Sequence, residues 1–207
     1  MTHTPQVDKT HYAGAAYRSS DRWMSYFHQL GLIEKIGAKN VLEVGVGSGV
    51  LARELMARGV EVTTLDIAED LHPDIVSSVT DIPREAASFD AAVAFEVLEH
   101  MPFEESAQAL RELARVARTH VLVSLPHPGW VFSIIYKLPL LPKIEFFFQI
   151  PFFWRTHTFN GEHYWELGTK GYSIRHFINV AHACGLHLVS LQKHANDPAH
   201  RFFVFKK

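Results

Sequence analysis

The sequence predicts an α/β fold in which helices cover both faces of a doubly wound, mainly parallel sheet. Between residues 39 and 126, apolar segments of strand length alternate with amphipathic segments of helix length, as in consecutive βαβ units. A glycine-rich turn, Gly45–Gly49, joins the first predicted strand to the helix after it. Polar residues follow several strands at their carboxyl ends, where parallel sheets bind ligands. The chain therefore has the layout of a ligand-binding α/β domain.

Helix and strand signals place the elements in order. Ser19-Ser20-Asp21 can cap a first helix, and Ser173 can cap the last one. Gly59 and Gly185 are suited to end helices, because glycine adopts the left-handed conformation easily. The predicted helix after Pro102 carries Arg111, Arg115 and Arg118 on a solvent face. The predicted strands cover residues 41–44, 60–65, 75–79, 89–95, 121–125, 186–191 and 202–205, with a connecting loop over 194–200.

The bulk composition restricts the class of protein. The 207 residues are 47% hydrophobic and 20% charged, with a net charge of −2, which favours one globular domain. That charge gives no reason to expect a nucleic acid or an anionic membrane as partner. A single cysteine, Cys184, excludes an internal disulfide and fits a reducing compartment. Neither a signal peptide nor a transmembrane segment is recognisable, so a cytoplasmic location is expected.

The residues around the glycine turn suggest a nucleoside ligand. The turn has the spacing G-x-G-x-G, one residue shorter than the dinucleotide fingerprint. Glu43 lies two positions before Gly45, and Asp66 ends the second predicted strand about 20 residues beyond the turn, where a carboxylate can bind ribose hydroxyls. Asp81 and Ile82 can present a carboxylate and an apolar side chain to an adenine ring.

These motifs, in this order and spacing, resemble the class I S-adenosylmethionine-dependent methyltransferases that act on small molecules. The resemblance covers roughly residues 39–126 and is carried by Leu42–Gly49, Thr64–Ile67, Asp81-Ile82, Phe89-Asp90 and Phe95–His100. It implies a Rossmann-like sheet of seven strands whose last strand inserts antiparallel. We expect four segments: an N-terminal helical cap (1–38), the cofactor-binding half (39–129), an aromatic substrate lid (130–170), and a C-terminal helix with a closing strand pair (171–207).

The resemblance also implies which residues bind S-adenosylmethionine. They are Glu43, Gly45 and Gly47 at the methionine portion, Asp66 and Ile67 at the ribose and adenine, Asp81 and Ile82 at the adenine, and Phe95 and Glu96 at the sulfonium. Residues 130–170 correspond to the variable part of such enzymes, which holds the methyl acceptor. The identity of the acceptor therefore does not follow from the resemblance.

Histidines are the candidate bases. Methyl transfer to a hydroxyl needs a base of near-neutral pKa or a metal ion, and histidine suits the first role. His100 and His127 follow the fourth and fifth predicted strands, and His163 lies in a polar, aromatic segment further on. We predict His163 as the base, with His127 and His100 as alternatives, because Glu162 and Glu166 are close enough in sequence to orient it. A purely structural role stays open for each.

A metal ion is the alternative to a histidine base. Glu96, Glu99 and His100 would share one face of a helical turn, and some quinol-type O-methyltransferases carry a similar Glu-x-x-Glu-His that is linked to a divalent ion. We favour the simpler interpretation, in which Glu99 and His100 brace the loop by hydrogen bonds. No metal is predicted.

Residues 130–160 form the most aromatic part of the chain. Three hypotheses compete for this insert: a substrate lid, a surface for a homodimer, or a contact with a membrane surface. We favour the lid.

The function predicted from the sequence is methyl transfer from S-adenosylmethionine to a small, apolar or amphipathic acceptor, most simply on oxygen. A non-catalytic cofactor-binding regulator is the alternative. An NAD-dependent dehydrogenase is less consistent, because the glycine spacing is short and a second mononucleotide half is missing.

Overall fold

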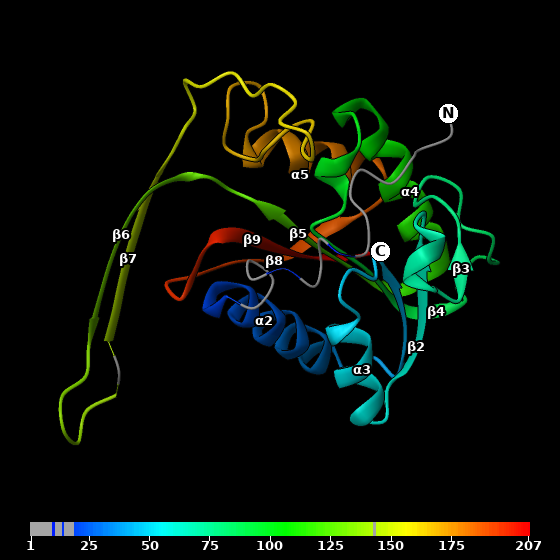
Figure 1. Cartoon of the computed structure of the whole chain (residues 1–207), viewed down its shortest axis with the longest axis horizontal. Helices are drawn as coiled ribbons and strands as arrows, with labels where there is room; N and C mark the ends of the chain where they lie inside the picture. Colours follow the sequence, from blue (N-terminus) through cyan, green and yellow to red (C-terminus); the bar gives the residue numbers. More distant parts are fainter. Residues whose placement is uncertain (1–9, 11–13, 15–18, 143) are drawn as a thin grey trace.

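A seven-stranded sheet forms the centre of the molecule, with the strand order β3-β2-β1-β4-β5-β9-β8 (Figure 1). The computed structural model describes residues 10, 14, 19–142 and 144–207, so most of the cap predicted for residues 1–18 lies outside the described residues. Strands β3, β2, β1, β4 and β5 each pair in parallel with the next strand in this order. Strand β9 is antiparallel to both of its neighbours. This confirms the mostly parallel sheet with an antiparallel last strand. The strands are β1 (Asn40–Val44), β2 (Glu61–Asp66), β3 (Ile75–Val76), β4 (Phe89–Phe95), β5 (Ala117–Pro126), β8 (His187–His194) and β9 (Asp197–Lys206).

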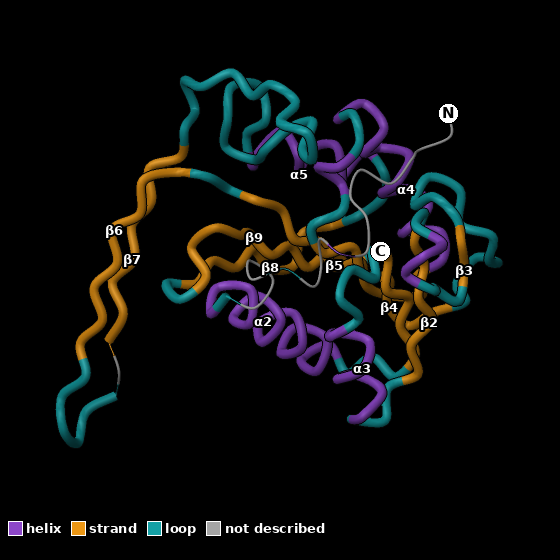
Figure 2. The backbone as a smooth tube through the Cα atoms, viewed as in Figure 1, coloured by secondary structure: helices purple, strands orange, loops and turns teal. Residues whose placement is uncertain are grey.

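Helices cover both faces of this sheet (Figure 2). On one face, α2 (Ser20–Ile36) and α3 (Val50–Ala57) pack against inward side chains such as Val41 and Val93. On the other face, α4 (Ser106–Val116) and α5 (Ile174–Ala183) pack against the alternate side chains, such as Leu42 and Ala92. Because successive strand residues point to opposite faces, the continuous apolar strands predicted from the sequence supply both cores.

The caps explain where the helices begin and end. The Ser19 side chain accepts a hydrogen bond from the Arg22 backbone N–H at the start of α2, and Ser173 does the same for the N–H of His176 at the start of α5. Gly37 and Gly185 follow the helix ends with positive φ. Both serine caps agree with the sequence analysis.

Three boundaries differ from the predicted ones. Strand β5 begins at Ala117, so Arg118 extends from the sheet, where its guanidinium pairs with the Asp90 carboxylate at 2.9 Å. The predicted helix had included Arg118. Strand β3 has two residues rather than five. Strands β8 and β9 continue through polar and histidine-rich ends, so that only residues 195–196 separate them instead of the predicted loop over 194–200.

The aromatic insert forms a hairpin of its own. Strands β6 (Gly129–Tyr136) and β7 (Ile144–Pro151) make a separate two-stranded sheet, which extends away from the main body (Figure 1). The chain then returns through residues 152–173 to α5. Aromatic and β-branched residues favour strands, but no alternation of polar side chains marks these two in the sequence. Within the described residues, no helix is long and apolar enough to cross a membrane.

Candidate functional site

The glycine turn joins β1 to α3 in a conformation that requires glycine. Gly45, Gly47 and Gly49 have φ values of 83°, 52° and 67°, in the left-handed region that other residues rarely adopt. A Cβ atom on Gly45 would lie 2.5 Å from Cγ2 of Val97, so no larger residue fits there without movement. The turn therefore lies close against the end of β4, with the N-terminus of α3 directed toward this edge of the sheet.

Asp66 connects the end of β2 to this turn. Its Oδ2 accepts a hydrogen bond from the backbone N–H of Val46 at 2.8 Å, and its Oδ1 accepts one from the N–H of Ala68 at 2.9 Å. Burial raises the pKa of Asp66, while these backbone hydrogen bonds oppose the rise. Each carboxylate oxygen retains a lone pair for a further donor. Asp66 and the half-buried Ile67 therefore lie beside the glycine turn.

Glu43 places an unsatisfied carboxyl group at the same edge. Its side chain is 4% exposed, and its Oε2 has no hydrogen-bond partner among the described residues. Burial, together with the charge of Asp66, raises the pKa of Glu43 to about 8. A buried acceptor without a donor is costly, so a ligand that brings an N–H group to Glu43 would remove that cost.

The other predicted cofactor residues lie on two neighbouring segments. Phe95 and Glu96 are half-buried at the end of β4. Asp81 and Ile82 lie between β3 and β4. Asp81 is exposed, whereas the Ile82 side chain is 2% exposed within the core cluster and its backbone N–H donates to Glu112. The structure thus gathers the residues of the glycine turn and β2, and it places the Ile82 side chain in the core.

Glu96 is the centre of an ion network that the sequence analysis missed. Its Oε2 lies 2.6 Å from the Arg22 guanidinium on α2 and 3.2 Å from Nε2 of His200 on β9. On the other side of the ring, Nδ1 of His200 lies 2.6 Å from Oδ1 of the buried Asp197. Glu96 has a φ of 56°, a strained value for a non-glycine residue. The network therefore joins the end of β4 to two distant elements.

The charges in this network reinforce one another. Burial disfavours the charged ring of His200, but Glu96 and Asp197 outweigh that effect and raise its pKa to about 10. Likewise, burial disfavours an ionised Glu96, but His200 and Arg22 hold its pKa far below the usual range. His200 is therefore a cation and Glu96 an anion at neutral pH. Nothing in the sequence distinguishes His200 from the other 13 histidines.

Trp165 anchors the segment that carries His163. The buried indole Nε1–H donates to the carbonyl oxygens of Leu98 at 3.2 Å and Met101 at 3.1 Å. Next to it, the backbone N–H of Tyr164 donates to the carbonyl of Glu99 at 2.8 Å. These bonds hold residues 160–167 against the loop after β4. The aromatic composition of the segment was visible in the sequence, but the partners of Trp165 were not.

His163 is paired with a carboxylate. Its Nδ1 lies 3.1 Å from Oε1 of Glu166, and Oε2 of the same carboxylate lies 3.5 Å from Nδ1 of His157. Burial disfavours the protonated ring of His163, yet the hydrogen bond to Glu166 and the charge of Glu99 raise its pKa above the ordinary value. A carboxylate at Nδ1 fixes the ring and makes it a stronger base.

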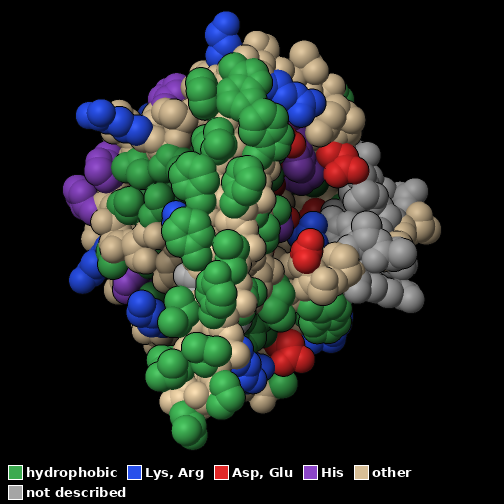
Figure 3. Space-filling model, turned by 90° about the vertical axis from the view of Figure 1, so that its left-hand side faces the viewer, with side chains coloured by type: hydrophobic (Ala, Val, Ile, Leu, Met, Phe, Trp, Pro, Cys, Tyr) green, Lys and Arg blue, Asp and Glu red, His purple; other side chains and the backbone are tan. Residues whose placement is uncertain are grey.

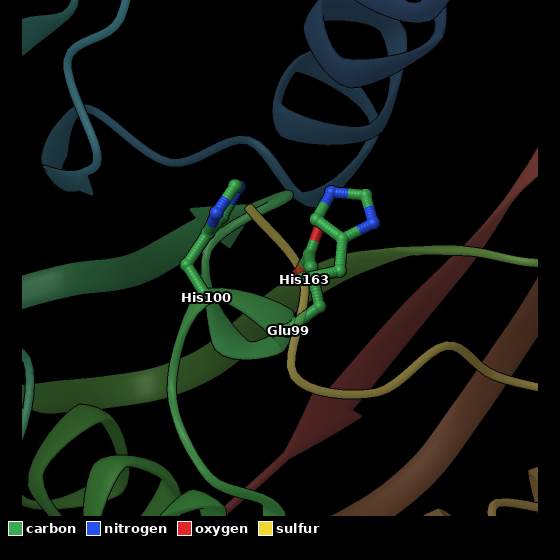
Figure 4. A group of neighbouring side chains, drawn as sticks. All are labelled: Glu99, His100 and His163. Carbon is green, nitrogen blue, oxygen red and sulfur yellow. The ribbon is translucent and has the colours of Figure 1, made fainter. Parts of the chain in front are cut away.

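Glu99, His100 and His163 form a compact group (Figure 4). Each offers one ligand atom, and these atoms lie within 4.8 Å of one another. Glu99 is fully buried, and neither of its carboxylate oxygens has a hydrogen-bond partner among the described residues. Burial raises the pKa of Glu99 to about 8, and burial also lowers that of His100 to about 4. The group could hold a divalent cation. Glu96 is not part of it, in contrast to the triplet considered from the sequence.

His127 has a different environment. It is 4% exposed, and its Nδ1 lies 3.3 Å from Oε1 of Gln149 on β7. A Cβ atom on Gly168 would lie 2.7 Å from its Nε2, so the ring is enclosed on that side. Burial and the charge of Arg201 lower the pKa of His127 to about 4. The ring is thus neutral and packed where the hairpin joins β5.

Comparison with known proteins identifies the fold and the family. Residues 42–124 match the family model described as a methyltransferase domain, which covers the glycine turn, Asp66 and the β4 edge. The chain carries a class I S-adenosylmethionine-dependent methyltransferase domain. Part of it is 27% identical, over 133 residues, to a ubiquinone biosynthesis O-methyltransferase from Marinobacter nauticus, covering 52% of this chain and 55% of that protein. The chain spans about half the length of the curated relatives it matches.

Solved structures share the fold of this methyltransferase domain over nearly the whole chain. The magnesium protoporphyrin IX methyltransferase of Synechocystis, solved with bound S-adenosylmethionine, has a TM-score of 0.62 at 12% identity and covers 90% of this chain and 80% of that one. The 1,6-didemethyltoxoflavin N1-methyltransferase of Burkholderia thailandensis has a TM-score of 0.60 at 15% identity, covering 99% and 92%. At these identities the likeness concerns the fold alone.

Proposed function

We propose that this chain transfers the methyl group of S-adenosylmethionine to a hydroxyl oxygen of a small, apolar or amphipathic acceptor, with His163 as the general base. The observation that carries the proposal is the His163–Glu166 pair, held by Trp165 beside the loop after β4. This pair supports the assignment of a base at the edge of the sheet that also carries the glycine turn.

The glycine turn supplies the features that the cosubstrate needs. The unsatisfied Oε2 of Glu43 would accept a hydrogen bond from the methionine ammonium group, and Asp66 would accept from the ribose hydroxyls. Gly45 lets the turn pack against Val97, where a Cβ atom would lie 2.5 Å from Cγ2. S-adenosylmethionine, when bound, supplies a methyl carbon attached to a positively charged sulfur. The residues present therefore fit the cosubstrate.

The chain contributes orientation and a proton acceptor to the transfer. A methyl transfer is an in-line displacement, so holding donor and acceptor in line supplies much of the rate. When the acceptor oxygen bonds to the methyl carbon, the bond from that carbon to sulfur breaks and S-adenosylhomocysteine is the leaving group. The hydroxyl proton would pass to a ring nitrogen of His163, and Glu166 would stabilise the resulting imidazolium. The enclosed, weakly basic His127 is less suited to this role, and so is His100.

Aromatic side chains near His163 favour an apolar acceptor. The rings of Phe159 and Tyr164 lie 4.6 Å apart between their centroids, and both are exposed. Aromatic surfaces of this kind bind flat, apolar groups. We propose that residues 152–170, rather than the β6–β7 hairpin, enclose the acceptor.

A divalent cation is a second way to activate a hydroxyl at the same place. The observation that favours it is the pair of unsatisfied Glu99 oxygens beside His100 and His163. A cation there would lower the pKa of a bound hydroxyl, and His163 would then be a ligand instead of a base.

One experiment tests the proposal and separates these mechanisms. Formation of S-adenosylhomocysteine is followed with a panel of hydroxylated aromatic compounds, using wild type, His163→Ala and His127→Ala. We expect His163→Ala to lower turnover by about two decades or more, with S-adenosylmethionine affinity within a factor of about three, and added imidazole to restore part of the turnover.

Other outcomes would contradict specific parts of the proposal. Turnover that is lost in EDTA, and restored by Mg²⁺ but not by imidazole, would replace the base mechanism with the cation mechanism. Near-normal turnover in both single variants and in the double variant would exclude both histidines. Binding of S-adenosylmethionine without turnover of any acceptor would favour a regulatory role.

A further inference from the structure

One face of the β6–β7 hairpin is entirely apolar. We call residues 129–151 the arm. Because side chains alternate between the two faces of a strand, the cross-strand pairs of the arm that share this face are Trp130↔Ile150, Phe132↔Phe148, Ile134↔Phe146 and Tyr136↔Ile144. We call it the outer face. Seven of the eight side chains are between 49% and 59% exposed, and Figure 3 shows a stripe of hydrophobic side chains running down this side of the molecule.

The inner face of the arm is turned toward the body. Phe147 lies under the charged groups of Lys193 on β8 and Arg201 on β9, at 5.3 and 5.8 Å from its ring centroid. Gln149 donates to the carbonyl of His127 at 2.6 Å and also contacts the Arg201 guanidinium. These contacts fix the orientation of the arm at its base. Val131 and Ile135 on the inner face are 38% and 48% exposed, and the outer face is more exposed still and entirely apolar.

The size of the outer face matches a protein interface. A two-stranded ribbon is marginally stable in water without further packing, and large exposed apolar patches mark interaction sites. Large apolar side chains bury roughly 200 Å² each when fully covered, so seven that are half exposed offer about 700 Å². A standard interface buries about 800 Å² on each partner.

We propose that the outer face of the arm binds the outer face of a second copy of this chain, in a two-fold symmetric and antiparallel pair. Such an interface uses the same surface twice, so an apolar face is matched by an apolar face. The tip of the arm carries Leu138, Leu140 and Leu141, all exposed, and its base is flanked by the exposed Phe153 and Trp154. In the antiparallel arrangement, each apolar tip covers the aromatic base of the partner.

The charge of the arm favours a second copy over a membrane. Lys137, Lys143 and Glu145 are the only residues of 129–151 that are charged at neutral pH, which gives a net charge of +1. Attachment to an anionic lipid surface typically uses four to eight basic residues. A membrane that accepted only the tip would also leave Trp130 and Phe148, at the base of the outer face, in water.

The mass of the protein in solution tests this proposal. We expect sedimentation velocity to give about twice the 23.5 kDa of one chain at micromolar concentration. Ile134→Asp places a charge in the centre of the outer face, and we expect it to raise the dimer dissociation constant at least about thirty-fold. Val76→Asp, at the opposite edge of the sheet and equally exposed, is the matched control and should leave the mass unchanged.

Cysteine cross-linking tests the antiparallel arrangement in chains that keep the native arm. In a Cys184→Ser background, oxidation of Leu140→Cys mixed with Trp154→Cys should give a disulfide-linked dimer, and neither variant alone should do so. A monomeric wild type at about 50 μM, an Ile134→Asp variant that still dimerises, or absence of the mixed cross-link would overturn the proposal. So would a monomer that sediments with vesicles of anionic phospholipid, since the arm would then bind a membrane.

Discussion

The Nε2 atom of His200 lies 3.2 Å from Oε2 of Glu96 and joins β9 to the end of β4. Arg22 approaches the same carboxylate from α2 at 2.6 Å. Three segments far apart in the sequence therefore meet at one carboxylate whose side chain is 13% exposed, next to the strand end where the cosubstrate is expected. We therefore expect the protonation state of this group to affect the stability of the fold.

Stability should depend on pH through His200. We expect His200→Gln to lower the free energy of unfolding by about 3–5 kcal/mol near pH 6, because one partner of a buried ion pair is removed. The folded-state pKa of His200 is about 10 and its reference value is 6.5. Its contribution is therefore complete below pH 6.5 and is lost as the pH rises toward 10. Urea unfolding of wild type and His200→Gln between pH 6 and 10 measures this contribution to the free energy of unfolding.

The difference in the free energy of unfolding between wild type and His200→Gln should narrow as the pH rises from 6.5 to 10, by up to about 1.4 kcal/mol per pH unit. His182→Gln, which alters an exposed histidine on α5, serves as the control and should leave the free energy of unfolding close to that of wild type. A gap between wild type and His200→Gln that stays constant from pH 6 to 10 would show that the ring is not charged in the folded state.

Asp66→Ala should weaken S-adenosylmethionine binding. Each charge-assisted hydrogen bond to the ribose is worth about 1.5–3 kcal/mol, so titration calorimetry should show an affinity loss of at least about tenfold. Glu69→Ala, three residues further on and exposed, should bind normally. Unchanged affinity of a folded Asp66→Ala protein would remove Asp66 from the ribose site.

The pH dependence of turnover should report His163. A base acts when deprotonated, and Glu166 raises the pKa of His163, so kcat/KM should rise with pH through a value above 6.5. Glu166→Gln should move this limb to lower pH and reduce kcat. Glu162→Gln alters another carboxylate of the same segment, whose charge contributes less to the pKa of His163, and should move the limb less. Identical profiles for the two variants would mean that Glu166 does not act on the base.

Gly45→Ala should destabilise the fold more than Gly59→Ala does. Both glycines have similar positive φ values, so both substitutions pay the backbone cost of about 1–2 kcal/mol. At Gly59 the added Cβ meets no heavy atom within 4 Å, whereas at Gly45 it meets Val97 at 2.5 Å. Thermal unfolding should show a lower Tm for both variants and a larger decrease for Gly45→Ala. Titration with S-adenosylmethionine should show weaker binding for Gly45→Ala alone. Equal effects would show that Val97 moves aside freely.

The fold could be predicted because its signals are local. The alternation of strands and helices, the serine caps and the glycine turn each depend on residues close together in sequence. The positions of the glycine turn and Asp66 at one edge of the sheet could be predicted for the same reason. The resemblance supplied the antiparallel position of the last strand, which spacing alone does not determine.

The remainder of the site depends on contacts between distant segments. Glu96 meets Arg22 and His200 across separations of 74 and 104 residues, and Trp165 meets Leu98 across 67. None of these three contacts can be recognised from the periodicity or the composition of the sequence. The hairpin was missed for another reason: its outer face and much of its inner face are apolar, so the polar alternation that marks a half-buried strand is absent.

The insertion of β9 between β5 and β8 fixes an order of events during synthesis. Strand β8 leaves the ribosome before β9, but it pairs with no strand of the sheet except β9 among the described elements. Until residues 197–206 emerge, β8 has no place in the sheet and the edge of β5 is open. Strands β5 and β9 are far apart in the sequence, and the pairing of distant segments is slow. Open strand edges promote association between chains. A nascent chain paused before residue 197 should thus be the species that most needs a chaperone.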